Sequence, residues 1–325
     1  MEESKTGFLP MRHGISISKE MCPSSPQERE RMSQIPYASA IGSIMYAMIC
    51  TLPDLSYALS MTSRYQANPG EGHWIAVKNI LMYLRRTKDV FLVYGGEEEL
   101  GIKGHIDASF QTDKDDSRSQ SGFVFCLNGG AVSWKSSKQD TVADSRTEAE
   151  YIAASEAAKE AVWIKKFISE SGVVPSIADA IELYCDNNGA IAQEKELRSH
   201  QRSKHILRLF HLIREIIDEG DVEICKVHTD DNIANPLQSL WHSKGMIVTL
   251  SHLALDIFCV LCPQNPSLAA NHKGREGVAA HPNSKGSCAI SSSSGKEFPD
   301  FCSLVYSGGL SRDLDVNSME IKDSS

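Results

Sequence analysis

The sequence predicts an α/β domain over residues 100–238, built as a mixed sheet with helices packed against it. Apolar runs at 101–109, 121–127 and 131–137 are separated by polar or turn-forming residues, which indicates three adjacent antiparallel strands. Residues 146–171 contain no glycine or proline and are rich in alanine, glutamate and lysine, which favours one long helix. A strand, helices and a final strand follow, an order typical of α/β folds.

Each element of this domain has its own local pattern. Asn128-Gly129-Gly130 predicts a tight turn between the second and third strands. Gly172 is expected to end the long helix. Residues 181–185 form a short apolar run typical of a strand, 204–219 have the pattern of an amphipathic helix that stops at Gly220, and 221–227 supply the last strand.

Helical patterning precedes this domain, and no sustained pattern follows it. Residues 37–66 and 71–88 are predicted to be helical, with Trp74, Val77 and Leu81 at helical spacing, and 89–94 are predicted to be a strand. From residue 239 onward serine, glycine, asparagine and proline are frequent and periodicity is absent, so this tail is predicted to be disordered. The predicted divisions are therefore 1–99, 100–238 and 239–325.

Composition limits the classes of function. A formal net charge of −9 disfavours a protein that coats nucleic acid nonspecifically, so any nucleic-acid contact must be local. Nine dispersed cysteines favour a reducing compartment. Cys259 and Cys262 have the spacing of metal ligands, but the residues between them are apolar and no second pair follows, so a role in an apolar core is favoured over a zinc site.

The chain is expected to be intracellular, either cytoplasmic or nuclear, and not secreted. Its acidic and polar start, Met1-Glu-Glu-Ser-Lys5, lacks the basic and apolar regions of a secretory signal. The most apolar stretch, 246–262, is interrupted by His252 and Asp256 and barely reaches membrane-spanning length, so no membrane association is expected.

Four short segments place an acid at the end of a strand or the start of a helix: Gly-His-Ile-Asp-Ala-Ser at 104–109, Arg-Thr-Glu-Ala-Glu-Tyr at 146–151, Leu-Tyr-Cys-Asp-Asn-Asn at 183–188, and 227–237. With the segments 119–124, 132–139 and 199–206, they resemble the ribonuclease H domain of copia-type retrotransposon Pol polyproteins. Segments 35–46, 53–57 and 72–74 resemble the joining region from reverse transcriptase, so the resemblance covers about residues 6–237.

The resemblance implies a ribonuclease H-like mixed five-stranded sheet flanked by helices, over residues 100–238. It also implies that residues 1–99 are a helical extension, the remnant of the reverse transcriptase C-terminus and connection. The Asp-Asp turn of the polymerase lies further upstream in that family and is absent here, so no polymerase activity is expected.

By the same resemblance, Asp107, Glu150 and Asp186 are the catalytic acids that bind metal. Phosphodiester hydrolysis with two Mg²⁺ ions needs carboxylates that hold the ions roughly 3.5–4 Å apart, and Mn²⁺ could replace Mg²⁺. The alternative is that a strand-end aspartate is a cap and that a helical glutamate is solvated. The order of the three acids within matching motifs favours the metal site, whereas Glu148 is expected to be solvent-exposed.

Asn235 occupies the position at which the resemblance implies a fourth acid. Its amide oxygen can bind Mg²⁺ but brings no charge, so metal affinity should be lower. Asp230 and Asp231 precede this position and are interpreted as a helix cap or loop acids. His228 is interpreted as a loop histidine rather than as a proton shuttle.

A local basic ridge is the candidate nucleic-acid interface. Its residues are Arg198, Arg202, Lys204, His205 and Arg208. Such a ridge can bind phosphates of an RNA–DNA hybrid, and contacts to 2′-hydroxyls would identify the RNA strand. The alternative is a solvated helix face.

The resulting hypothesis is an Mg²⁺-dependent endonuclease that cleaves the RNA strand of RNA–DNA hybrids, leaves 3′-hydroxyl and 5′-phosphate ends, and uses no small-molecule cofactor. The alternative is a catalytically impaired remnant that only binds nucleic acid or has no activity. An integrase is excluded because it needs two aspartates followed by a glutamate, whereas the order here is Asp107, Glu150, Asp186.

Overall fold

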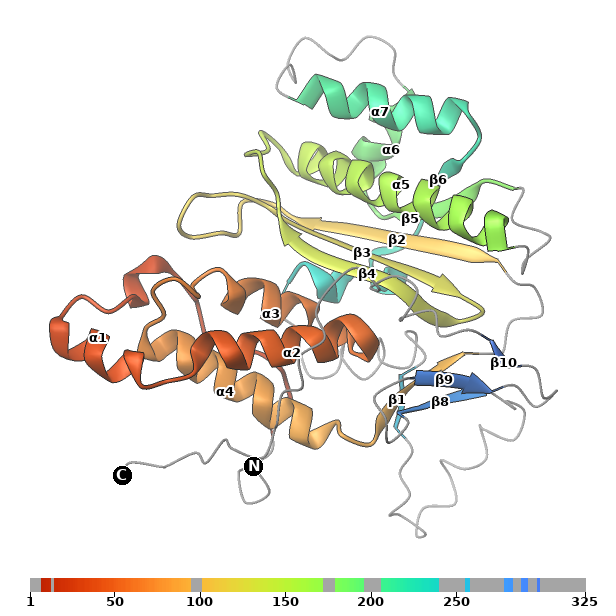
Figure 1. Ribbon diagram of the computed structural model, residues 1–325. Helices are drawn as coiled ribbons and strands as arrows, with labels where there is room; N and C mark the ends of the chain where they lie inside the picture. Colours follow the sequence, from red (N-terminus) through yellow and green to blue (C-terminus); the bar gives the residue numbers. More distant parts are fainter. Residues whose placement is uncertain are drawn as a thin grey trace.

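A five-stranded sheet in the order β4-β3-β2-β5-β6 lies at the centre of the molecule (Figure 1). The computed structural model describes residues 7–12, 15–94, 101–171, 179–195 and 206–239, and four short strands further along. The central strands are β2 (Ile102–Ser109), β3 (Gln120–Leu127), β4 (Gly130–Lys138), β5 (Ile181–Cys185) and β6 (Val222–Lys226). β2, β3 and β4 are antiparallel, whereas β5 runs parallel to β2 and β6 parallel to β5. The predicted mixed sheet is confirmed.

The hairpin between β3 and β4 turns on two residues, as the sequence predicted. Leu127 pairs with Gly130, and the turn residues Asn128 and Gly129 both have positive φ, 51° and 76°. A two-residue hairpin turn favours asparagine and glycine because both tolerate this left-handed conformation. The turn therefore fixes the register of the hairpin.

Three helices, α5 (Arg146–Ser171), α6 (Asn188–Lys195) and α7 (Leu207–Asp218), cover one face of the sheet (Figure 1). Phe125 and Leu183 of the sheet share a core with the alanine-rich side of α5. The rings of Tyr151 on α5 and Phe210 on α7 are 4.2 Å apart between centroids, which joins the two helices. The predicted end of the long helix, Gly172, lies outside the described residues.

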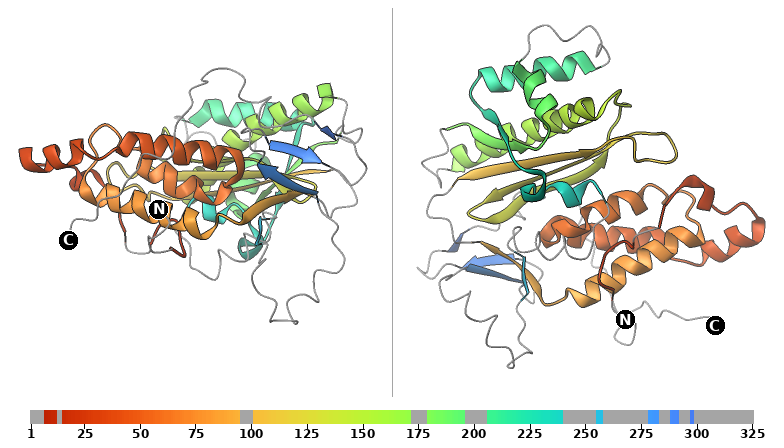
Figure 2. Two further views of the ribbon diagram at one scale, coloured as in Figure 1. Left: turned by 60° about the horizontal axis from the view of Figure 1, so that its bottom comes forward. Right: turned by 180° about the vertical axis from the view of Figure 1, so that it is seen from behind.

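The helices of the N-terminal region cover the opposite face of the sheet, so the described chain has three layers (Figure 2, right). They are η1 (Lys19–Met21), α1 (Pro26–Ser33), α2 (Tyr37–Thr51), η2 (Pro53–Leu55), α3 (Ser56–Ser63) and α4 (Glu71–Arg86). The helix predicted over 37–66 is broken at Pro53, because proline lacks the N–H that a helix interior needs. The indole of Trp134 on β4 donates to the carbonyl of Met48 on α2 at 3.2 Å.

A second sheet forms around β1 (Val90–Tyr94), in the order β10-β9-β8-β1-β7. β1 pairs antiparallel with β7 (Leu255–Ile257) and β8 (Val278–Pro282), and β9 (Cys288–Ser291) and β10 (Glu297–Phe298) extend this sheet. These four strands belong to the segment 239–325, and their pairing with β1 had no counterpart in the sequence prediction. The rest of that segment beyond residue 239 lies outside the described residues.

Asp54, in η2, predicts a pH dependence of stability. Its carboxyl accepts a hydrogen bond from the Tyr83 hydroxyl, and its Oδ1 is buried with no hydrogen-bond partner among the described residues. Burial raises the pKa of Asp54 from 3.8 to about 6. The folded protein therefore holds a proton that the unfolded chain has lost, and this contribution to stability is present below pH 3.8 and disappears as pH rises through 6.

In the wild type, Asp54 should lower the free energy of unfolding by about 2–3 kcal/mol as pH rises from 4 to 7.5. We expect Asp54→Asn to remove this loss, because the amide stays neutral at every pH. Urea unfolding at pH 4 and pH 7.5 measures it: the stability lost between the two pH values should be smaller in the variant than in the wild type. Asp89→Asn, at an exposed position, is the matched control and should lose as much as the wild type. An equal loss in Asp54→Asn would contradict the assignment.

No helix in the described part of the chain is long and apolar enough to span a membrane.

Candidate active site

Three acids that lie far apart in the sequence meet at one edge of the central sheet. β2 and β5 are parallel neighbours with His105 opposite Tyr184. Two residues further along each chain stand Asp107 and Asp186, so the register carries both to the same edge. Glu150, on the second turn of α5, lies beside them, and its carboxylate oxygen is within 4.8 Å of one from Asp186. The structure thus brings together Asp107, Glu150 and Asp186.

The start of α5 is fixed locally by Ser145 and Glu148. The hydroxyl of Ser145 accepts a hydrogen bond from the Glu148 amide at 3.2 Å, and the Glu148 carboxylate accepts one from the Asp144 amide at 2.9 Å. These bonds satisfy amides that a helix start otherwise leaves without partners. Glu148 is only 3% exposed, so the expectation that it is solvent-exposed is wrong. It caps the helix that carries Glu150.

The predicted fourth position also lies at this edge. The segment before it, η5 (Thr229–Asp231), leads to Asn232, whose side-chain amide donates to the carbonyl of Ile106 at 2.8 Å. The next turn, η6 (Asn235–Leu237), is followed by Gln238, whose Nε2 donates to Asp107 Oδ2 at 3.0 Å and to Asn235 Oδ1 at 3.2 Å. Gln238 therefore connects Asn235 to the acid cluster.

The close approach of η6 to the sheet depends on a glycine. Gly122, opposite Asp107 on β3, lies so near Leu237 that an added Cβ would stand 2.6 Å from the Leu237 Cβ. A side chain at position 122 would push η6, and with it Asn235 and Gln238, away from Asp107.

Burial and mutual repulsion disturb the titration of these acids. Burial, followed by the charge of Asp186, raises the pKa of Asp107 to about 6. Burial, followed by the charges of Asp107 and Asp186, raises the pKa of Glu150 much further. Glu150 and Asp107 share a hydrogen bond that raises the pKa of Glu150 and lowers that of Asp107, so Glu150 carries the proton. Without a cation, the site cannot hold three full negative charges.

Two buried oxygens at the acid cluster are available to bind a hard cation such as Mg²⁺. Glu150 Oε2 and Gln238 Oε1 are buried and have no hydrogen-bond partner among the described residues. Carboxylate and amide oxygens are the donors that Mg²⁺ prefers. The residues present therefore fit a divalent cation in kind and in charge.

His228, Asp230 and Asp231 lie on an exposed turn. The His228 and Asp230 side chains are 73% and 90% exposed, and His228 Nδ1 accepts a hydrogen bond from the Asp230 amide. Asp231 is also exposed. This agrees with their interpretation as cap and loop residues.

Of the predicted nucleic-acid ridge, the structure describes Arg208, which is exposed on the first turn of α7. Arg198, Arg202, Lys204 and His205 lie outside the described residues. Phe210, two residues after Arg208, packs with a tilted ring against Tyr151, the neighbour of Glu150 on α5. A second cation, Lys226 on β6, donates a hydrogen bond to the Asp186 carbonyl.

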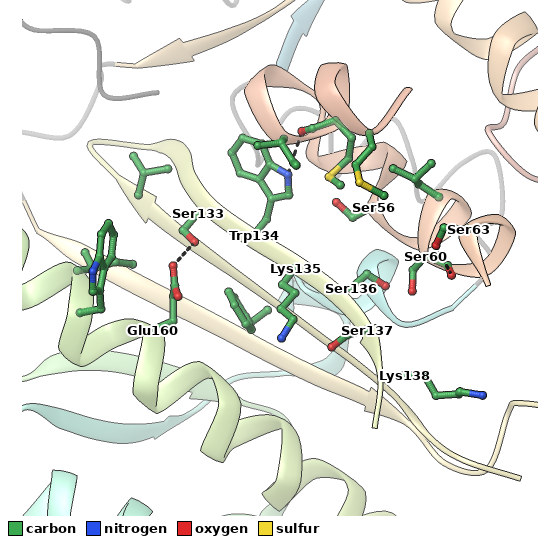
Figure 3. Close-up of a pocket in the computed structure, with 18 of the residues that line it drawn as sticks. Ser56, Ser60, Ser63, Ser133, Trp134, Lys135, Ser136, Ser137, Lys138 and Glu160 are labelled. Carbon is green, nitrogen blue, oxygen red and sulfur yellow. Dashed lines mark hydrogen bonds between the residues drawn. The ribbon is translucent and has the colours of Figure 1, made fainter. Parts of the chain in front are cut away.

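A groove of about 580 Å³ lies elsewhere, between β4, the N-terminal helices and α5 (Figure 3). Its floor is the strand segment 132–138, flanked by Ser56, Ser60 and Ser63 on one side and by Glu160 on the other. Ser133 donates to Glu160 at 2.7 Å. None of the predicted acids lines this groove.

Sequence reasoning missed two residues of the acid cluster. Gln238 was treated as the point where the resemblance ends, although it stands three residues after Asn235 and so on the same side of a helical turn. Cys185 was not singled out among the nine cysteines, although it adjoins Asp186. Its Sγ lies within 4.8 Å of carboxylate oxygens of both Glu150 and Asp186.

No protein-family model matches the chain. It is 42% identical over 237 residues to the retrovirus-related Pol polyprotein from transposon TNT 1-94 of Nicotiana tabacum, which is 73% of this chain and 18% of that protein. It is 36% identical over 203 residues to the Pol polyprotein from transposon RE2 of Arabidopsis thaliana, which is 62% of this chain and 14% of that protein. The chain thus spans less than a fifth of either relative.

A shorter relative is covered almost completely. The secreted RxLR effector protein 161 of Plasmopara viticola is 46% identical over 133 residues, which are 41% of this chain and 94% of that protein. Among solved structures, LC11-RNase H1 isolated from compost matches 42% of this chain and 92% of its own, with 15% identity and a TM-score of 0.33. RNase H1 from Halobacterium salinarum matches 41% and 89%, with 20% identity and a TM-score of 0.29.

Proposed function

Because this chain belongs to the family of retrovirus-related Pol polyproteins from copia-type transposons, we propose that it is a ribonuclease H-type endonuclease that cleaves the RNA strand of RNA–DNA hybrids. The observation that supports the proposal most is the convergence of Asp107, Glu150 and Asp186 at one sheet edge, where burial and the neighbouring charges raise the pKa of Glu150. The catalytic unit is residues 100–238, and residues 1–99 correspond to the end of a reverse transcriptase and its connection.

The metal ligands in this proposal are the three acids, with the amide oxygens of Asn235 and Gln238 in place of a fourth carboxylate. Mg²⁺ or Mn²⁺, when bound, supplies Lewis-acid stabilisation of the charge that develops on the phosphate. Gln238 holds Asp107 by donating to its Oδ2, which orients the carboxylate. Asn232 holds the whole η6 segment on the backbone of β2, and thereby positions Gln238 and Asn235.

The substrate would lie across the acid cluster with its phosphates near the start of α7 and the end of β6. Arg208 and Lys226 are exposed cations on these two elements. The remaining predicted contacts are Arg198, Arg202, Lys204 and His205. Cations at these places would bind the phosphate backbone irrespective of base sequence.

Cleavage of defined duplexes tests the proposed substrate class. The purified chain should cut the RNA strand of a labelled RNA–DNA hybrid in Mn²⁺, leaving 3′-hydroxyl and 5′-phosphate ends, and should leave duplex DNA and duplex RNA intact. Binding of the hybrid without cleavage would instead support the alternative of a catalytically impaired remnant. The replacement of the fourth acid by Asn235 is the specific observation that favours this alternative.

The amide at position 235 predicts weak binding of Mg²⁺, which a carboxylate at this position should strengthen. In Asn235→Asp we expect the Mg²⁺ concentration for half-maximal cleavage to fall by about tenfold, since an ionised ligand adds roughly 1.4 kcal/mol or more to cation binding. Cleavage rates across an Mg²⁺ titration measure this. In the wild type, Mn²⁺ should support faster cleavage than Mg²⁺.

Asp230→Asn is the matched control, since Asp230 is the exposed acid nearby. It should leave the Mg²⁺ titration unchanged. A loss of cleavage in Asp230→Asn, together with no effect of Asn235→Asp, would mean that Asp230 and not position 235 supplies the fourth ligand.

A further inference from the structure

Cys185 faces the acid cluster rather than only the apolar core. It ends β5 on the side covered by α5 and is fully buried. Its Sγ and the carboxylate oxygens of Glu150 and Asp186 all lie within 4.8 Å of one another. A thiol is a poor ligand for Mg²⁺ but a strong one for thiophilic ions such as Zn²⁺ and Cd²⁺. The proposed nuclease chemistry therefore gives this sulfur no role.

The three ligand atoms lie almost at the spacing that a tetrahedral zinc site needs. With Zn–S about 2.3 Å and Zn–O about 2.0 Å, the ligand atoms of such a site are about 3.5 Å apart. Closing from 4.8 Å or less to this spacing shortens each separation by at most about 1.3 Å. One sulfur and two oxygens leave the fourth position for water.

A second observation points to a ligand at this place. Glu150 is 6% exposed, and its Oε2 is buried without a hydrogen-bond partner among the described residues. A buried carboxylate oxygen with no partner costs free energy that a bound cation would recover.

We propose that Cys185, Glu150 and Asp186 form a site for a thiophilic divalent cation, Zn²⁺ in the cell, that excludes Mg²⁺ from the same carboxylates. When the Zn–S and Zn–O bonds form, the thiol proton of Cys185 and the carboxyl proton of Glu150 leave to solvent. Zinc binding thereby withdraws two of the three acids from the hard cations. Only the inhibitory consequence rests on the proposed function, because metal binding itself requires no nucleic acid.

Cd²⁺ is the spectroscopic probe for this site, since a cadmium–thiolate bond gives an ultraviolet charge-transfer band. All proteins in the experiment are full-length and carry serine at positions 259 and 262, because that pair has the spacing of metal ligands. Titration with Cd²⁺ should give the band at one equivalent. Zn²⁺ should abolish it by competition, whereas millimolar Mg²⁺ should weaken it only modestly.

Cys185→Ser should lose the band and bind Zn²⁺ at least about tenfold more weakly, because it removes the sulfur ligand. Cys225→Ser is the matched control: Cys225 lies opposite Tyr184 on the neighbouring strand and so on the other face of the sheet from Cys185. It should keep the band unchanged. A band that persists in Cys185→Ser would overturn the proposal.

Glu150→Gln keeps the thiol and guards against misfolding of Cys185→Ser. It should lower Cd²⁺ affinity at least about tenfold while the band, once saturated, keeps its intensity. Unchanged affinity in Glu150→Gln would also overturn the proposal. Failure of the hybrid-cleavage assay leaves these spectra unaffected, so the metal site and the nuclease function are tested separately. If cleavage is present, micromolar Zn²⁺ should inhibit it in the wild type and much less in Cys185→Ser.

Discussion

Replacing Glu150 by glutamine should abolish hybrid cleavage and, in the metal-free protein, raise the free energy of unfolding at pH 7. Burial and the neighbouring acids raise the pKa of Glu150 far above its ordinary value of 4.5. At pH 7 the folded protein therefore keeps a proton that the unfolded chain has lost, which costs stability. Glutamine removes this cost, and we expect a gain of about 2 kcal/mol at pH 7.

The sign of this effect can be checked with pH. Stability linked to a carboxyl group of raised pKa is fully present below pH 4.5 and is lost at higher pH. The gain in Glu150→Gln should therefore shrink towards zero at pH 4, as urea unfolding would measure. Cleavage should fall by at least about 100-fold, which is about 2.7 kcal/mol of transition-state stabilisation.

Glu148→Gln is the matched control on the same helix. Its carboxylate accepts a hydrogen bond from the Asp144 amide and does not belong to the acid cluster. We expect it to lower stability by about 1 kcal/mol, as for other helix-start residues, and to leave cleavage within about threefold. Equal losses of cleavage in both variants would show that Glu150 acts through the fold of α5 rather than as a ligand.

Arg64→Ala should destabilise the protein by about 3 kcal/mol, because it leaves a buried carboxylate without its closest cation. The guanidinium of Arg64, just after α3, pairs with Asp113 and donates to Gln120 at the start of β3. The side chains of Arg64 and Asp113 are 15% and 4% exposed. Lys138 and the amides of Asp115 and Asp116 would still contact Asp113 and would limit the loss.

Arg118→Ala is the control. Arg118 pairs with Asp116 at 3.5 Å, and both side chains are more than a third exposed, at 37% and 34%. We expect a change within about 0.5 kcal/mol. Urea unfolding followed by tryptophan fluorescence and by circular dichroism measures both variants. Similar small effects for Arg64 and Arg118 would contradict the view that the N-terminal helices and the sheet are energetically coupled.

Local patterns were sufficient to predict the central sheet, and the family resemblance pointed to three acids that the structure brings together. Alternating apolar residues and the turn at Asn128 and Gly129 specify β2 to β4, and the parallel register then places Asp107 and Asp186 together. The segment 146–151, which contains Glu150, was identified by its resemblance to the ribonuclease H domain of copia-type Pol polyproteins. These features depend on residues that are close in sequence or on a topology that the order of elements implies.

What the sequence did not reveal depends on long-range contacts. Arg64 and Asp113 are 49 residues apart, and Gln238 and Asp107 are 131 apart, so neither pairing has a local pattern. Glu148 looked solvent-exposed because capping by a glutamate depends on the chain direction before the helix. The apolar run around Cys185 gave no sign that burial brings its sulfur to the carboxylates of Glu150 and Asp186.

Metal-dependent cleavage of one RNA–DNA hybrid, compared between the wild type and Asp107→Asn, is the decisive test of a nuclease site built on the three acids. Asp107 is 5% exposed and adjoins both Glu150 and Gln238, so its replacement by an amide removes charge while the shape of the site is kept. Our expectation is that the wild type cuts only the RNA strand, in Mn²⁺ and not in excess chelator, and that Asp107→Asn, folded by circular dichroism, does not cut it. Cleavage that survives in Asp107→Asn, or that proceeds in chelator, would contradict it.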